Sequence, residues 1–155
     1  TWQTNTADTI RILHGDLPRP EIRIAFQRYR GNNPVPFARV LRDQPEGIFF
    51  YINPERPLEE FINDWTAYHE FTHLFIPYPG NADIWFSEGL ASYYQNVLQA
   101  RAGLLTKDEA REKLRAGFEL GRKNSGQPGF YQCNQYWWHA SLPALQLTND
   151  SLVFE

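Results

Sequence analysis

The chain has 155 residues, of which 42% are hydrophobic and 15% aromatic, and its formal net charge is −3 at pH 7. This composition suits one folded domain, residues 1–155, with a substantial core, and it excludes a disordered chain. The near-balanced charge argues against nucleic-acid binding through phosphate neutralisation. A lone cysteine, Cys133, excludes an internal disulfide and is expected to be a small apolar packing residue.

No apolar run approaches the ~20 residues that a transmembrane helix needs, and no signal peptide is recognisable. The chain begins at Thr1 rather than at Met, so a segment is expected upstream of it, either a leader or another domain. The sequence leaves the location open, and export to the periplasm or the medium of a bacterium is the favoured expectation. The sequence leaves the oligomeric state open.

The N-terminal third is expected to form one helix and a small sheet. Thr6 is the predicted N-cap of the helix and Gly15 its stop. Residues 21–27 alternate between apolar and polar, which is typical of a half-buried strand. Two further strands are predicted, at 37–41 and at 48–52, and the second is apolar throughout, as expected of a strand covered on both faces.

One long helix is predicted over residues 57–76, between Pro57 and Pro77. Apolar positions recur in it at helical spacing and define a buried stripe, formed by Phe61, Ile62, Trp65, Tyr68 and Thr72. The sheet and first helix would then occupy residues 1–53.

Residues 81–147 are expected to be mostly helical. A helix should open near Asn81 or Asp83 and run to about Ala102. Thr106–Glu109 has the pattern of a capping box, and a charged amphipathic helix should follow it to Gly121. The last helical pattern, residues 134–147, should be kinked at Pro143.

The predicted long helix contains two histidines four residues apart, in the motif His69-Glu70-Phe71-Thr72-His73. Residues four apart share a helix face, so both imidazoles can bind one ion and leave an open position for water. Glu70 would border that water and could take its proton. The alternative is a pair of half-buried histidines bonded to the backbone or to acids.

Catalytic zinc needs a third protein ligand from another part of the chain. The metzincin solution would need Gly at position 76 and His at position 79, where this chain has Ile76 and Pro79. Glu88 is the candidate, because an antiparallel second helix would bring its carboxylate towards the histidines. Asp83 is the reserve ligand, and the alternative for Glu88 is a carboxylate favoured by the helix dipole.

The motif and the following Trp85-Phe-Ser-Glu88-Gly-Leu-Ala-Ser-Tyr-Tyr94 resemble the gluzincins, most of all the glycyl aminopeptidase-type branch and more distantly the larger zinc aminopeptidases. The resemblance is clearest from Trp65 to Tyr94. It implies an α+β fold of the thermolysin-like zincin type, with a small three-stranded or larger sheet packed on the active-site helix and a mostly helical C-terminal half. The implied site has Zn²⁺ on His69, His73 and Glu88, with Glu70 as general base.

A peptidase also needs a donor for the oxyanion that forms during attack on the carbonyl. Tyr136 is the candidate, because Tyr-Trp at this place resembles the relatives, and Tyr131 and His139 are competitors. Aromatic packing is the alternative for Tyr136. Ser92, one turn after Glu88, could bond a ligand histidine, although a packing serine is the simpler interpretation.

Two functions from different classes remain. The first is a zinc-dependent peptidase, amino- or endopeptidase, whose extended substrate adds to an exposed sheet edge. The residues expected to bind that substrate are Phe37, Ala38, Arg39 and Val40. The second is a non-catalytic, zinc-containing peptide-binding or scaffolding domain. A metal-free interaction domain is a weaker third option.

Overall fold

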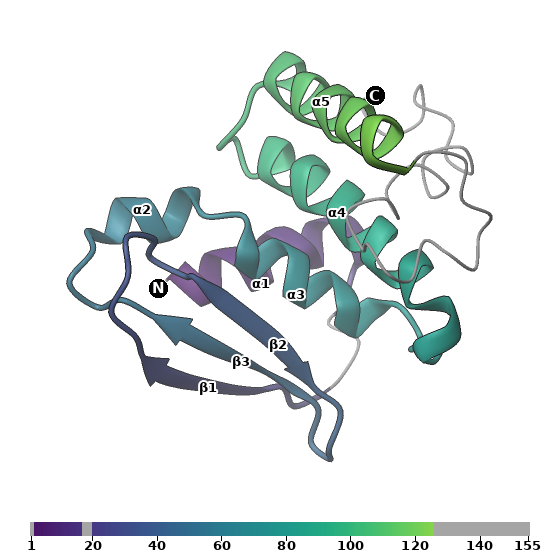
Figure 1. The fold of residues 1–155 in the computed structure, drawn as a ribbon. Helices are drawn as coiled ribbons and strands as arrows, with labels where there is room; N and C mark the ends of the chain where they lie inside the picture. The colour runs from purple at the N-terminus through teal and green to yellow at the C-terminus, as the bar shows by residue number, and fades with distance from the viewer. Residues whose placement is uncertain (1, 17–19, 126–155) are drawn as a thin grey trace. The chain divides into compact units, whose positions relative to one another are not determined.

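The structure, a computed structural model, describes residues 2–16 and 20–125, and it divides into two compact units, Thr1–Phe75 and Ile76–Glu155. Within the described residues, no helix combines the length and apolar composition needed to cross a membrane. The predicted α+β class is confirmed: a small three-stranded sheet is accompanied by a mostly helical remainder (Figure 1). The single domain expected over residues 1–155 stays a prediction, and each unit is described by itself.

The first unit contains the sheet and three helices. Its elements are α1 (Trp2–His14), β1 (Arg23–Arg28), β2 (Phe37–Leu41), β3 (Gly47–Ile52), α2 (Leu58–Asn63) and α3 (Thr66–Phe75). The second unit contains a short 3-10 turn, η1 (Asn81–Asp83), followed by α4 (Ile84–Arg101) and α5 (Lys107–Ser125).

The three predicted strands form one sheet in the order β1-β3-β2. The central strand β3 pairs in parallel with β1 and antiparallel with β2, so that β2 is an edge strand among the described residues. Gly47 opens β3 directly opposite Arg23, and a Cβ on Gly47 would lie 2.0 Å from the Arg23 carbonyl oxygen. The close approach of β1 to β3 therefore requires glycine at this position.

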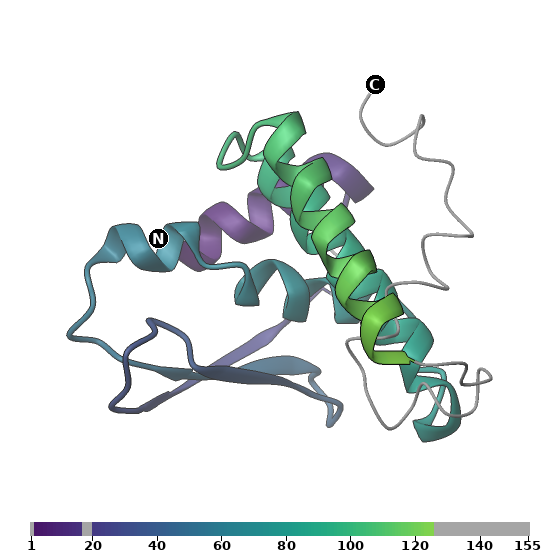
Figure 2. The same ribbon diagram turned by 45° about the horizontal axis from the view of Figure 1, so that its top comes forward.

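All three helices of the first unit lie on one face of the sheet (Figure 2). Towards them, Ile48 and Phe50 are completely buried, and the ring of Trp2 in α1 packs against Phe50 at 5.3 Å between centroids. Phe49 and Tyr51 are only half-buried. The expectation that residues 48–52 would be covered on both faces is therefore wrong.

The second face of β3 carries aromatic contacts instead of a helical layer. Tyr51 packs against Phe37 of β2 and against the neighbouring Phe49, with centroids 5.7 and 5.1 Å apart. The guanidinium of Arg39 lies 5.5 Å from the centre of the Phe49 ring. A strand can therefore be apolar throughout although only one of its faces is covered by helices. On the other face its aromatic rings pack against each other and against a cation.

Helix α1 begins earlier than the sequence predicted, at Trp2 rather than after a cap at Thr6. Thr6 lies inside the helix, where its hydroxyl donates to the Trp2 carbonyl one turn back. A threonine can satisfy its hydroxyl in this way, so the residue type alone did not mark a helix start. The predicted stop is confirmed, since Gly15 adopts a φ of 84° just after the helix.

The long helix predicted over residues 57–76 is wrong: two helices, α2 and α3, occupy this range, with an interruption at Asp64. Asp64 adopts an extended backbone (ψ 135°), and its carboxylate accepts the Thr66 N–H at 2.8 Å. Aspartate stabilises a helix start by accepting such N–H groups. This side chain therefore ends one helix and begins the next.

The described part of the second unit, up to residue 125, follows the sequence prediction closely. Helix α4 ends at Arg101, and Gly103 adopts a φ of 74° just after it. The capping box is confirmed, because the Thr106 N–H donates to the Glu109 carboxylate at 2.7 Å while the Glu109 N–H donates to the Thr106 hydroxyl at 3.2 Å. Its core joins α4 and α5 through Tyr93, Val97, Tyr94, Leu114 and Phe118. The helix predicted over residues 134–147 lies outside the described residues.

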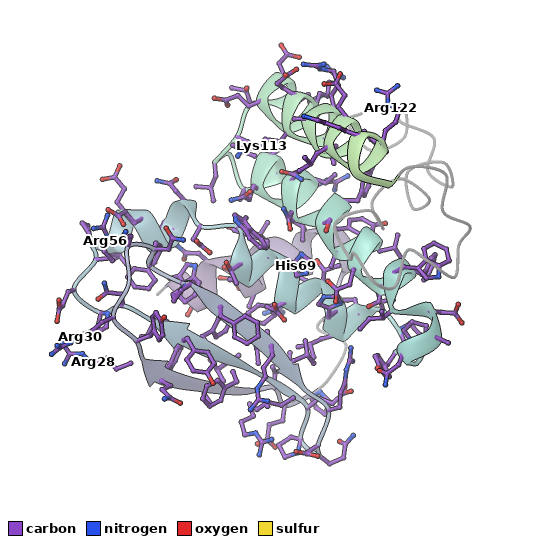
Figure 3. All side chains as sticks on the ribbon, viewed as in Figure 1. Arg28, Arg30, Arg56, His69, Lys113 and Arg122 are labelled. Atoms are coloured by element: carbon purple, nitrogen blue, oxygen red, sulfur yellow. The ribbon has the colours of Figure 1, made fainter. Side chains whose placement is uncertain are left out.

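Several charged side chains of the first unit lie at its surface, among them Arg28, Arg30 and Arg56 (Figure 3). Arg28 binds Glu55 at 2.5 Å, and Arg56 binds Glu60 through two contacts of 2.6 Å. Such exposed pairs contribute little to stability. The polar side chains of α3 are buried instead, and their burial needs a separate explanation.

Candidate metal centre

Helix α3 buries the titratable side chains of the motif, His69, Glu70 and His73, each with at most 9% of its surface exposed. The helix is fixed on both sides, because it packs against β2 and against α1. Polar groups are seldom buried unless they are hydrogen-bonded or bind a ligand. A rigid, buried position is also what an accurately placed ligand side chain requires.

The two imidazoles point at one another across one turn of α3. The Nε2 atoms of His69 and His73 are 3.2 Å apart, and the rings meet at 80° with centroids separated by 4.8 Å. Zn²⁺ binds imidazole nitrogen at about 2.0–2.1 Å in tetrahedral geometry, which places two ligand nitrogens about 3.4 Å apart. The observed separation suits a shared ion as well as it suits a hydrogen bond between two neutral imidazoles.

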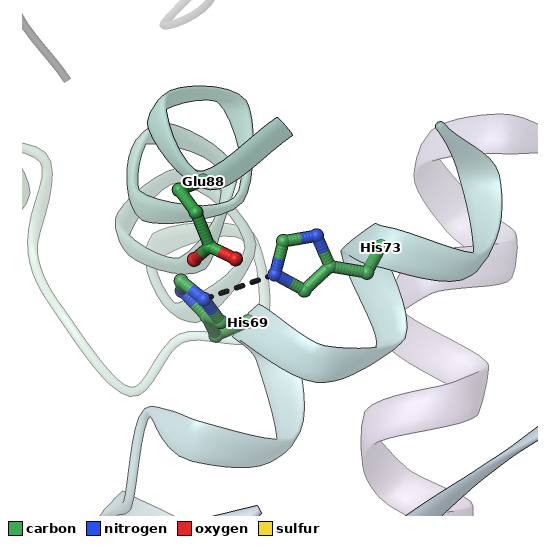
Figure 4. A group of neighbouring side chains, drawn as sticks. All are labelled: His69, His73 and Glu88. Atoms are coloured by element: carbon green, nitrogen blue, oxygen red, sulfur yellow. Dashed lines mark hydrogen bonds between the residues drawn. The ribbon is translucent and has the colours of Figure 1, made fainter. Parts of the chain in front are cut away.

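The predicted third ligand, Glu88, lies in the first turns of α4. One ligand atom each of His69, His73 and Glu88 can be chosen so that all three lie within 4.8 Å of one another (Figure 4). Among the described residues, this is the group of histidine and carboxylate side chains that could hold a metal ion. Two nitrogens and one carboxylate are the donor set of catalytic zinc sites that keep a position open.

Comparison with known families adds an independent observation on the second unit. Residues 79–132 match the family model of the M61 glycyl aminopeptidases. This is a gluzincin family, so the predicted resemblance is confirmed over that segment. The matched segment contains Glu88 and the capping box of α5, whereas the His69–His73 motif precedes it. No curated protein and no solved structure gives a significant match.

The family match supports a peptidase. The family model matches a different range from the one in which the sequence motifs were recognised. The motifs lie mainly at Trp65–Tyr94, and the model matches residues 79–132. The two ranges share residues 79–94, where the Trp85-Phe-Ser-Glu88-Gly pattern lies.

The structure places the other predicted site residues as follows. On the edge strand β2, Phe37 and Arg39 are exposed while Ala38 is buried and Val40 half-buried, which fits an alternating strand. The reserve ligand Asp83 is exposed at the N-cap of α4. The carbonyl of Ser92 accepts the Asn96 side-chain amide. The oxyanion candidates Tyr136, Tyr131 and His139, together with Cys133, lie outside the described residues.

Two residues close to the histidine pair were not predicted as part of the site. Arg42, at the end of β2, donates to the carbonyl of His73 at 3.4 Å and lies 3.7 Å from the Glu46 carboxylate. A cation near the last carbonyls of a helix is favourable, so Arg42 stabilises the end of α3 that carries His73. Trp65 was predicted to be buried, but it is 43% exposed and its ring contacts His69.

Two titratable groups anchor α3 at its N-terminal half. Burial raises the pKa of Tyr68, although hydrogen bonds with Thr9 and Thr6 of α1 act in the opposite direction. The phenol therefore stays neutral at pH 7. Burial likewise raises the pKa of Asp64, while its hydrogen bonds to Thr66 lower it. Tyr68 therefore joins α3 to α1, and Asp64 holds the start of α3.

Proposed function

We propose that the protein is a zinc-dependent peptidase in which His69, His73 and Glu88 hold the ion and Glu70 is the general base. The observation that carries this proposal is the 3.2 Å separation of the two Nε2 atoms on adjacent turns of α3. The peptidase family match around Glu88 supports it independently. Two buried histidines in an H-E-x-x-H helix, with their Nε2 atoms at the spacing of shared zinc ligands, are the arrangement typical of catalytic zinc sites.

The chemistry that a bound zinc would supply is a coordinated water whose pKa is lowered to about 7, together with polarisation of the substrate carbonyl. Glu70 follows His69 directly in the helix and is itself buried. Its carboxylate would take a proton from the water and pass it to the leaving amine. A general base must reach both groups, and a position beside the first ligand on a rigid helix meets that requirement.

The substrate would lie extended along β2, which is an edge strand with its outward positions exposed. Backbone hydrogen bonds to an edge strand fix the direction of a peptide, and alternate side chains then set preference. The residues proposed to contact it are Phe37, Ala38, Arg39 and Val40. Tyr136 is proposed as the oxyanion donor, with Tyr131 and His139 as competitors.

The test combines zinc content with peptide turnover in the wild type and in Glu70→Gln. We expect one zinc per chain in both proteins and a loss of about 10²–10⁴-fold in kcat in Glu70→Gln, because the base is removed and the ligands are kept. The matched control is Glu59→Gln, an exposed carboxylate in the first turn of α2, which should keep full activity.

Full activity of Glu70→Gln would contradict the assigned base, and absence of zinc from active wild-type protein would contradict the metal. Zinc and peptide affinity without turnover would instead favour the non-catalytic peptide-binding domain. Peptides with free and acetylated N-termini separate the two peptidase types, because an aminopeptidase needs the free amine. The family match favours the aminopeptidase.

A further inference from the structure

Trp65 is the large apolar side chain that the structure leaves exposed next to the histidine pair. It is 43% exposed, although the residues that follow it in α3, from Thr66 to Leu74, are all buried. An exposed indole offers apolar surface that is favourably buried when a ligand covers it. Its position just before α3 places it beside the proposed site of peptide cleavage.

His69 and His73 lie one turn apart on one face of α3, and Trp65 lies directly before the helix, four residues ahead of His69. The Trp65 and His69 rings meet at 80° with centroids 5.5 Å apart. The helix start is held by the Asp64 carboxylate on the Thr66 N–H, and the His69 N–H donates to the Trp65 carbonyl at 3.1 Å. The indole is therefore attached to the same rigid element as the two imidazoles.

We propose that Trp65 forms the wall of a side-chain subsite that selects peptides with an aromatic or long aliphatic residue beside the cleaved bond. The proposal rests on the proposed function, because a peptide whose carbonyl lies at the imidazoles carries its neighbouring side chains only a few ångströms away. An indole 5.5 Å from the His69 ring is within reach of such a side chain. Covering the exposed ring with apolar atoms is favourable, and the geometry allows edge-to-face or stacked aromatic contact.

A purely structural role for Trp65 makes a different prediction. If the indole served only to orient His69, its removal would weaken zinc binding and would affect every substrate by the same factor. If it forms a subsite wall, its removal abolishes discrimination between substrates and leaves the metal in place. Substrate preference is therefore the readout that separates the two roles.

The experiment measures peptide affinity by calorimetry in the Glu70→Gln background, supplied with zinc, so that binding is read without turnover. The probes are peptides of one length and charge that differ at a single position next to the expected cleavage site, which is Phe, Leu, Ala or Asp. The variants are Trp65→Ala and the conservative Trp65→Phe. The control is Leu58→Ala, which removes an apolar side chain that is 63% exposed at the start of α2. Zinc content and thermal unfolding are recorded for each protein.

We expect the parent to bind the Phe peptide about 10–100-fold more tightly than the Ala peptide. Trp65→Ala should reduce this ratio to within about threefold, and Trp65→Phe should retain most of it, with zinc content unchanged in both. Leu58→Ala should behave as the parent.

Equal affinity of the parent for the Phe and Ala peptides, or no binding of any peptide, would overturn the proposal. So would a Trp65→Ala protein that weakens all peptides equally or loses zinc. Failure of the proposed function is read separately, as absence of zinc or of turnover in the wild type. A domain that binds peptides without cleaving them could still show the Trp65-dependent preference.

Discussion

Replacement of Asp64 tests how the start of α3, and with it the histidine pair, is held in place. In Asp64→Ala the Thr66 N–H loses the acceptor that lies at 2.8 Å. Loss of such a cap costs about 1–2 kcal/mol in the free energy of unfolding. Asp64→Asn keeps a side-chain oxygen as acceptor and removes the partly buried charge, so at neutral pH it should be at least as stable as the wild type.

The pH dependence of this pair follows from the raised pKa of Asp64. A carboxyl whose folded-state pKa is raised contributes stability that is fully present below its unfolded-state pKa. That contribution is lost as the pH rises through the folded-state value. The Asn variant lacks this loss, so its stability relative to the wild type should increase as the pH rises above the ordinary value of 3.8.

Urea unfolding of the three proteins, followed by circular dichroism at about pH 4 and about pH 7, measures both effects. The predicted order at neutral pH is Asn equal to or above wild type and Ala below both. An alanine variant as stable as the wild type would show that the Asp64 carboxylate does not hold the start of α3. If the stability of Asp64→Asn relative to the wild type decreased as the pH rises, the claim that burial raises the pKa of Asp64 would be refuted.

Two further changes test the fold of each unit. Gly47→Ala places a Cβ 2.0 Å from the Arg23 carbonyl oxygen and should lower the free energy of unfolding by about 3 kcal/mol. Gly117→Ala, whose Cβ would meet nothing within 4 Å, should raise it by about 0.4–1 kcal/mol. Equal effects of the two changes in urea unfolding would contradict the predicted clash. Thr106→Ala removes the capping box of α5 and should lower the free energy of unfolding by about 1 kcal/mol; unchanged hydrogen exchange in the first turn of α5 would contradict it.

Local chemistry made the helix boundaries predictable in the part of the second unit that the structure describes. The paired side chains of Thr106 and Glu109 satisfy each other's backbone N–H groups, so the sequence specifies that helix start without help from packing. Gly103 marks the end of α4 for a similar reason, since glycine adopts positive φ at little cost. Signals of this kind lie within a few residues of each other.

The first unit depends more on contacts between distant residues. The apolar spacing of Phe61, Trp65 and Tyr68 continues through the break between α2 and α3, and the polar Asn63-Asp64 pair was the only local sign of it. Strand β1 pairs in parallel with β3 rather than with β2, which follows it in the chain. The apolar patterns of the strands do not show which strands pair or in which direction. The exposure of Trp65 also depends on what packs beside it.

The candidate metal centre was predictable because its first two ligands lie one helical turn apart, a spacing that sequence shows directly. Glu88 could be proposed from its motif, which lies within the segment that matches the family model. Arg42 could not be found in this way, since its contact with the His73 carbonyl depends on how β2 lies beside α3. Its only local signal was Glu46 four residues later in the turn.

Anomalous scattering at the zinc absorption edge, from crystals grown without chelator, tests the central claim most directly. The account predicts one peak, about 2.0–2.1 Å from Nε2 of both His69 and His73, with a carboxylate oxygen of Glu88 at about 2.0–2.2 Å. A peak bound by other residues, or two imidazoles hydrogen-bonded to each other with no peak between them in zinc-supplied crystals, would contradict it.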